Sequence, residues 1–191
     1  LGLARHDDAV AAALGASAIR LTVQRLLRAG SLDTVVVATG DVDWVAGRLG
    51  DLAGSDRVRI ERVDADLLRS RTRAVGRARL MSPDAWRGSL GGLSCYDESL
   101  DPGLCAGLLE NVGLDAGLIV GADWVLVDPG LVDAVVTRYR ERPDVVRLSL
   151  TQAAPGLAGI LFDRRSMGDL AGALGHAMNY ASIGGALSYL P

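Results

Sequence analysis

The chain has 191 residues, of which 49% are apolar and 23% charged, and its formal net charge is −3. This length and balance are typical of one globular domain with a sizeable core, and they exclude a disordered chain. The negative charge argues against a general nucleic-acid binder, whose affinity rests on many phosphate contacts. No apolar run approaches the roughly 20 residues that span a bilayer, so we expect no membrane association.

The cysteines indicate the cellular compartment, and the basic residues indicate how a phosphate could be bound. Cys95 and Cys105 are too few for a disulfide framework and lack metal-ligand spacing. Since the N-terminus also lacks a secretory signal pattern, we expect a reducing, cytoplasmic location. All 20 basic residues are arginine, so guanidinium groups would have to hold any phosphate.

The first part of the chain alternates between helical and strand periods. Apolar residues at helical spacing predict a helix over 17–29, with Ser17 as its N-cap. The β-branched run 35–39 predicts a strand buried on both faces, and helical spacing returns over 42–52. Alternation over 58–63 then predicts a half-exposed edge strand.

Composition changes between residues 64 and 100, where arginine and glycine accumulate and the apolar pattern weakens. We predict a short helix followed by a flap or insertion within a single domain, 1–191. Nine arginines lie between Arg57 and Arg87. They form either a solvated face or a surface for phosphate or anionic sugars.

Ordered patterns resume at Asp101-Pro102, and Asp128-Pro129 repeats the same start. An aspartate followed by proline is typical of an N-cap and the first helical position, so each pair predicts the beginning of a helix. The second of these helices runs to about Arg142. Further strands are predicted over 117–122, 145–150 and 159–162, and a last helix over 166–174.

Strands separated by helices of ten or more residues need crossover connections, which bring the strands parallel. We therefore predict a three-layer α/β/α domain with a mainly parallel, mixed sheet. In such sheets ligands bind beyond the carboxyl ends of the strands. Asp123 follows the predicted strand 117–122, and a carboxylate there suits Mg²⁺, which takes one or two carboxylates plus phosphate oxygens. The alternative is that Asp123 only caps a turn before Trp124.

Other candidates are weaker. Asp128 is explained as a helix cap and is not assigned to the metal. Trp86 and Arg87 lie in a glycine-rich stretch whose Gly91 and Gly92 permit close approach of a ligand, so we assign Arg87, Gly91 and Gly92 to substrate binding. These glycines lack the strand-turn-helix context of a phosphate loop.

Two stretches carry a family resemblance: LGASAIRLTVQRLLRAGSLDTVVVATGD, from Leu14 to Asp41, and GLIVGADWVLVDPGLVDAVVTRYRE, from Gly117 to Glu141. Both resemble blocks of sugar-activating nucleotidyltransferases with the glycosyltransferase-A-like fold, and the second resembles the cytidylyltransferase-like group that includes spore-coat polysaccharide biosynthesis proteins. The resemblance implies Mg²⁺-dependent transfer of a nucleotidyl group, usually CMP from CTP, to a sugar or sugar acid. Enzymes of this group often form homodimers.

The resemblance also implies site residues. It assigns Asp123 to the metal and Leu3, Ala4 and Arg5 to the nucleotide, with Arg5 as the catalytic contact to the triphosphate. The chain departs from the family pattern at 6–13, where HDDAVAAA replaces a loop rich in glycine and lysine. Its two acids would repel phosphate.

Three interpretations follow. The first is a nucleotidyltransferase, and the second is a degenerate domain that binds a nucleotide or sugar nucleotide without transfer chemistry. The third, a sugar-nucleotide glycosyltransferase, needs a second acidic metal ligand, for which Asp41-Val42-Asp43 is a candidate. That pair is more simply explained as the cap of the helix after it.

Overall fold

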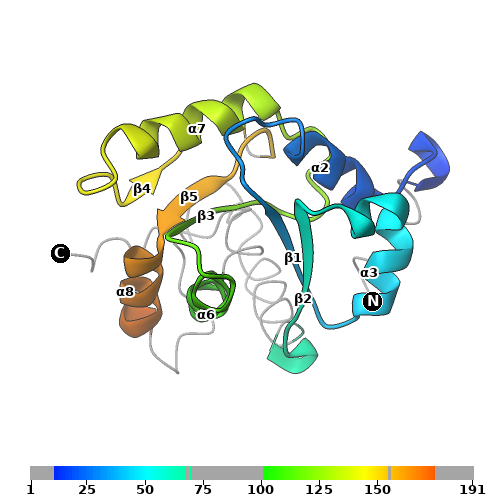
Figure 1. The fold of residues 1–191 in the computed structure, drawn as a ribbon, viewed down its shortest axis with the longest axis horizontal. Helices are drawn as coiled ribbons and strands as arrows, with labels where there is room; N and C mark the ends of the chain where they lie inside the picture. The colour runs from blue at the N-terminus through cyan, green and yellow to red at the C-terminus, as the bar shows by residue number, and fades with distance from the viewer. Residues whose placement is uncertain (1–10, 68, 70–100, 155, 175–191) are drawn as a thin grey trace, which may run out of the picture. The chain divides into compact units, whose positions relative to one another are not determined.

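The computed structural model describes residues 11–67, 69, 101–154 and 156–174, and it has a mixed α/β fold (Figure 1). Two compact units make up the chain: the first contains Leu1–Asp64 and Val120–Ile160, and the second contains Ala65–Ile119 and Leu161–Pro191. None of the described helices has the length and apolar character needed to cross a membrane. The elements, in chain order, are α2 (Ala18–Leu26), β1 (Val35–Thr39), α3 (Val42–Leu49), η1 (Gly50–Gly54), β2 (Val58–Arg62), α6 (Pro102–Val112), β3 (Ala116–Ile119), α7 (Pro129–Glu141), β4 (Leu148–Ser149), β5 (Ile160–Asp163) and α8 (Arg164–Leu174).

In the first unit, β1 and β2 form a parallel pair. Their register places Val35 opposite Val58 and Thr39 opposite Arg62. The sequence of β1 is Val-Val-Val-Ala-Thr, whereas β2 exposes Arg59 and Arg62, a composition that suits an edge strand. Both strands are confirmed close to their predicted bounds, although only the first and third residues of β1 are fully buried.

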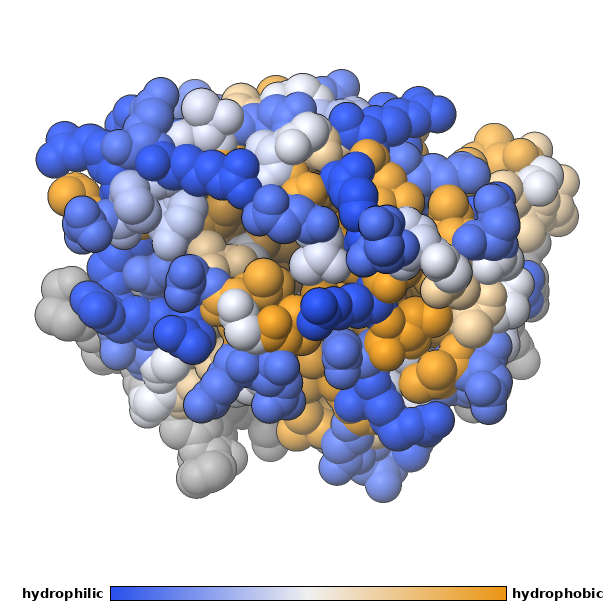
Figure 2. Space-filling model, in the orientation of Figure 1, coloured by the Kyte–Doolittle hydropathy of each residue, from blue (hydrophilic) through white to orange (hydrophobic). Residues whose placement is uncertain are grey.

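Helices supply most of the core of the first unit. The apolar face of α2 buries Ile19 and Val23, and this helix packs against α3 and α7. The inner face of α7 buries Val132, Val135 and Val136. Its outer face is charged, and Figure 2 shows hydrophilic side chains along the upper edge of the view, where α7 runs. This is the amphipathic pattern that the apolar spacing predicted.

Side-chain caps start five of the described helices, four of them as predicted; the fifth is Asp163, which accepts from the Ser166 N–H at 2.6 Å at the start of α8. The carboxylates of Asp41, Asp101 and Asp128 each accept a hydrogen bond at 3.0 Å from the backbone N–H three residues later. Ser17 Oγ accepts from the N–H of Arg20 at 3.3 Å. Each cap satisfies one of the backbone donors that a helix start leaves without an intrahelical partner.

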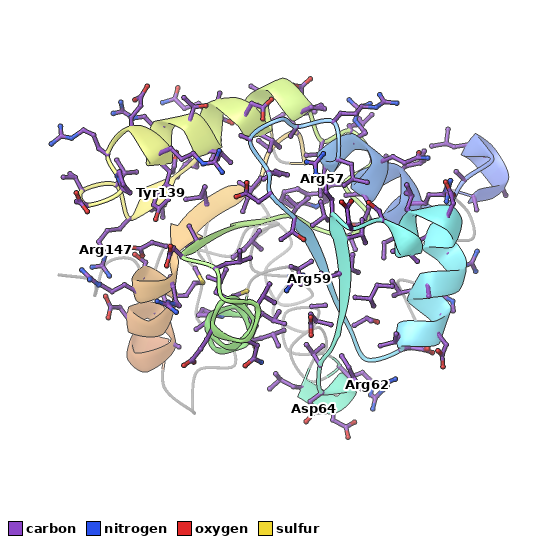
Figure 3. All side chains as sticks on the ribbon, in the orientation of Figure 1. Arg57, Arg59, Arg62, Asp64, Tyr139 and Arg147 are labelled. Carbon is purple, nitrogen blue, oxygen red and sulfur yellow. The ribbon has the colours of Figure 1, made fainter. Side chains whose placement is uncertain are left out.

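The connection between α2 and β1, residues 27–34, is tied to the start of β2 by Arg57. The Arg57 guanidinium donates to the carbonyl oxygens of Leu27 at 3.1 Å, Ala29 at 3.3 Å and Leu32 at 2.7 Å. Figure 3 shows Arg57 at the beginning of β2. One cation therefore satisfies three carbonyls of this connection.

The same connection is tied to α7 by Asp133. One Asp133 oxygen accepts from the Ser31 N–H at 2.9 Å and the Ser31 hydroxyl at 2.5 Å, and the other accepts from the Gly30 N–H at 3.3 Å. The Ser31 hydroxyl bond, followed by the backbone bonds, lowers the pKa of this carboxyl below its usual value. These bonds stabilise the ionised form.

In the second unit, α6 packs against α8. Phe162, Met167 and Leu170 are fully buried, and Leu109 of α6 is nearly so. The Arg164 N–H donates to the Asp115 carbonyl at 2.7 Å, which joins the end of β5 to the residue before β3. Burial also raises the pKa of the Cys105 thiol on α6 to about 12, so this thiol stays protonated at neutral pH.

The prediction of one mainly parallel sheet is wrong, because the described strands form two small sheets. Besides the parallel pair, a three-stranded antiparallel sheet has the order β3-β5-β4. Residues 150–159, between β4 and β5, contain no helix, and without a crossover helix two strands in succession run antiparallel. The three-layer arrangement stays a prediction.

Two predicted strands are shorter in the structure. The predicted buried strand 117–122 is β3, which ends at Ile119 and is half-buried along its whole length. The predicted strand 145–150 shrinks to Leu148–Ser149, with Val145 and Leu150 exposed on either side. Of the predicted flap, the structure describes only residues 65–67 and 69, which are helical, and the rest lies outside the described residues.

We expect Arg57→Ala to lower the free energy of unfolding by on the order of 2 kcal/mol, because three carbonyls lose charge-assisted hydrogen bonds. Urea denaturation measures this loss. Arg59→Ala, which removes an exposed arginine from β2, two residues after Arg57, is the matched control and should change stability by less than about 0.5 kcal/mol. Equal losses in the two variants would contradict the role of Arg57.

We expect the stabilising effect of Asp133 to depend on pH. Because its folded-state pKa is lowered, the ionised carboxylate stabilises the folded chain above the unfolded-state pKa of about 4, and this stabilisation is lost as pH falls through the folded-state pKa. Asp133→Asn should therefore lower the urea midpoint at neutral pH, and the difference from wild type should shrink toward about pH 3. A difference that stayed constant with pH would contradict this account.

Candidate functional site

The turn segment, residues 120–128, joins β3 to α7 and carries Asp123. Backbone hydrogen bonds within the segment form successive turns. The Trp124 N–H donates to the Gly121 carbonyl at 3.1 Å, the Val125 N–H to the Asp123 carbonyl at 2.9 Å, and the Val127 N–H to the Trp124 carbonyl at 3.0 Å. Asp123 therefore lies within a run of tight turns that leaves its backbone little freedom.

The far end of the turn segment is anchored to other parts of the first unit. Val127 is fully buried, and its carbonyl accepts from Arg25 Nε of α2 at 2.5 Å. The Asp128 N–H donates to the Leu157 carbonyl at 2.7 Å, and the Asp128 carboxylate caps α7. This confirms the prediction that Asp128 is a helix cap.

Asp123 itself is half-buried. Its predicted position directly after a strand is wrong, because β3 ends at Ile119 and the chain has already begun to turn at Gly121. The residue still follows a strand and precedes a capped helix. It thus presents its carboxylate from a tied backbone turn and not from the last residue of a strand.

Asp123 is the residue that the sequence assigns to Mg²⁺, and that assignment stays a prediction. Within the residues that the structure describes, no group of three or more His, Cys, Asp and Glu side chains is placed to hold a metal ion. Mg²⁺ is commonly held by one or two carboxylates, with phosphate oxygens and water filling the other positions. A single half-buried carboxylate on a fixed turn suits that kind of site.

The pair Asp41 and Asp43 does not behave as a second acidic site. Asp41 caps α3 through the Trp44 N–H, and its own N–H donates to the Thr39 hydroxyl at 3.0 Å. Asp43 is exposed in the first turn of α3. The interpretation of this pair as a helix cap is confirmed for Asp41.

The described arginines of the region 57–87 have different roles. Arg57 binds loop carbonyls, and sequence reasoning missed this because no local pattern marks the loop it reaches. Arg59 and Arg62 are exposed, and Arg62 makes a long contact of 3.5 Å to the Gly40 carbonyl (Figure 3). Arg69 pairs with Asp66 at 2.5 Å. At least one of the nine arginines is therefore structural and not available to a ligand.

The remaining predicted site residues lie outside the described part of the chain. These are the nucleotide-binding Leu3, Ala4 and Arg5 and the substrate-binding Arg87, Gly91 and Gly92. Of the predicted site, the structure therefore places Asp123 alone.

No family model, curated protein or solved structure matches this chain. The resemblance to cytidylyltransferase-like proteins accordingly stays a prediction. Function has to be argued from the residues and from the turn that carries Asp123.

We expect Asp128→Ala to lower the free energy of unfolding by about 1 kcal/mol, the usual effect of losing a helix cap. Thermal or urea unfolding measures it, and Asp128→Asn, which keeps a capping oxygen, should retain most of the stability. A loss of ligand binding with unchanged stability would instead make Asp128 a ligand.

Proposed function

We propose that this chain is a nucleotidyltransferase-like protein that transfers a nucleotidyl group, most simply CMP, from a nucleoside triphosphate to a sugar or sugar acid. The observation that carries the proposal is the turn segment 120–128. There a half-buried carboxylate, Asp123, stands on a hydrogen-bonded turn between a strand and a helix capped by Asp128. The order of strand, carboxylate and capped helix is the order that the resemblance implies.

The first unit adds support. The order α2, β1, α3, β2, with parallel pairing of the two strands, is that of a helix-crossover unit of the kind that builds nucleotide-binding α/β domains. We extend the proposal to a three-layer α/β/α domain with a cytoplasmic location and to a possible homodimer. The mixed α/β composition is compatible with this finer arrangement.

In this proposal Asp123 holds Mg²⁺ together with phosphate oxygens of the substrate. When bound, the ion neutralises negative charge on the phosphates. The part of the protein is to keep the Asp123 carboxylate in one position, which the turn bonds and the buried Val127 achieve. A carboxylate that is held in place loses less conformational freedom when the ion binds.

The other contacts in the proposal come from the resemblance. The guanidinium of Arg5 contacts the triphosphate, since arginine is the one residue type in this chain that can provide a permanent cation. Leu3 and Ala4 line the nucleotide beside it. Arg87, Gly91 and Gly92 face the sugar or sugar acid.

A second candidate is a domain that binds a nucleotide or sugar nucleotide without transferring anything. One observation favours it: residues 11–14, at the end of the altered segment, are helical and apolar, where the resemblance implies a flexible phosphate-binding loop. A helical turn of alanines offers no side-chain donor to a phosphate.

Pyrophosphate release tests the first proposal against the second. The purified protein is incubated with each nucleoside triphosphate, Mg²⁺ and a panel of sugar phosphates and sugar acids, and nucleotide binding is measured in parallel by calorimetry. We expect release with at least one pair of substrates. Nucleotide binding without any release would support the second candidate and overturn the first.

We expect Asp123→Asn to reduce the rate of pyrophosphate release on the order of 10²-fold or more while the protein stays folded, because the metal loses its charged ligand. Asp56→Asn, in an exposed turn of the same unit, is the matched control and should keep the wild-type rate. Full activity of the Asp123→Asn variant would show that the metal site lies elsewhere.

A further inference from the structure

Trp124 packs against the backbone of Gly121 inside the turn segment. Gly121 is buried, and the indole of Trp124 occupies the space where a side chain at position 121 would begin. A Cβ atom added to Gly121 would lie 2.7 Å from Trp124 Cδ1 and 2.8 Å from Cε2, and still nearer to Nε1. Real Cβ atoms essentially never approach other atoms within 3.0 Å, so any residue other than glycine must displace the indole.

This contact encloses Asp123. The residue stands between Gly121 and Trp124 in a turn closed by the bond from the Trp124 N–H to the Gly121 carbonyl. The indole contact and the backbone hydrogen bond both join Gly121 to Trp124. The turn is therefore closed by one side-chain contact and one backbone bond. We expect that displacement of the indole shifts the backbone between these two residues, and Asp123 with it.

The residues that follow Trp124 are held in place by other contacts. The Trp124 carbonyl accepts from the N–H of Val127, which is fully buried and bonded through its own carbonyl to Arg25. The residues after Trp124 are therefore fixed. We expect a change at Gly121 to shift the backbone between residues 121 and 124, where Asp123 lies.

We propose that Gly121 and Trp124 are positioning residues for the Asp123 carboxylate, acting through the contact between the indole and the glycine backbone. This inference rests on the proposed function, in which Asp123 is the metal ligand. It makes the Gly121–Trp124 contact, and not only the carboxylate, a requirement of the metal site.

A titration with Mn²⁺, a paramagnetic substitute for Mg²⁺, in the presence of CTP and without a sugar acceptor tests the inference without depending on turnover. Broadening of the Asp123 amide signal in ¹⁵N NMR spectra reports binding at the site. Gly121→Ala should weaken Mn²⁺ binding about tenfold, the usual scale for a residue that supports a metal ligand. Trp124→Ala should weaken it similarly, and the double variant should be no weaker than the weaker single variant, because both changes remove one contact.

Gly47→Ala is the matched control. Gly47 belongs to α3 in the same unit, and a Cβ added there meets no atom within 4 Å. This variant should bind Mn²⁺ as the wild type does. If Gly121→Ala does not fold, Trp124→Ala, which removes the indole and leaves Gly121 unchanged, carries the same test.

The outcomes separate the inference from the proposed function. Wild-type Mn²⁺ affinity in Gly121→Ala, with a lowered urea midpoint, would make the contact merely structural and overturn the inference alone. Additive losses in the double variant would also overturn it. Absence of Mn²⁺ broadening at Asp123 in the wild type, with each nucleoside triphosphate in turn, would remove the metal site itself, and the proposed function would fall together with the inference.

Discussion

The binding of Arg57 to three carbonyls of the connection between α2 and β1 is the interaction on which the first unit depends. The connection spans residues 27–34, and this guanidinium supplies the hydrogen bonds to the carbonyls of Leu27, Ala29 and Leu32. Asp133 satisfies the N–H groups of the same connection from α7. Arg57 thus donates to carbonyls of this connection, and Asp133 accepts from its N–H groups. Through these bonds the connection links α2, β1, β2 and α7.

The turn segment 120–128 depends on this framework. Its last residues are fixed by α2 through Arg25 and by the cap of α7 through Asp128, and both helices are positioned by the same connection. Within the segment, the indole of Trp124 packs against the backbone of Gly121, on the other side of Asp123. The candidate site is therefore a short, closely packed turn and not a loop free to choose its conformation. The fixed backbone is the reason for proposing the Asp123 carboxylate as the metal ligand.

Patterns of a few residues predicted the local features well. Asp128-Pro129 predicted a cap and the start of a helix, and the run 35–39 predicted a strand, because each depends on neighbours in sequence. The end of β3 was predicted less well. The apolar run continues past Ile119, but the chain turns at Gly121, since Trp124 packs back against it. Apolar character alone does not distinguish a strand from a packed turn.

Local sequence patterns could not predict which strands pair. Helices between strands predicted a parallel sheet, which is correct for β1 and β2 and wrong for the sheet of β3, β5 and β4. Strand pairing joins residues far apart in the chain, and the absence of a helix between 150 and 159 matters only once β4 and β5 are known to be neighbours. In the same way, the nine arginines of 57–87 appeared equivalent until the fold brought Arg57 to its carbonyls.

By itself, the sequence determined the alternation of helices and strands, the caps at Asp41, Asp101 and Asp128, and the choice of Asp123 as the leading candidate. Each follows from the chemistry of residues adjacent in the sequence, which does not depend on tertiary contacts. Only the tertiary structure decided where β3 ends, which strands pair, and that Arg57 is structural. It also decided that glycine is required at 121, because that requirement comes from the Trp124 ring that fills the space beside it.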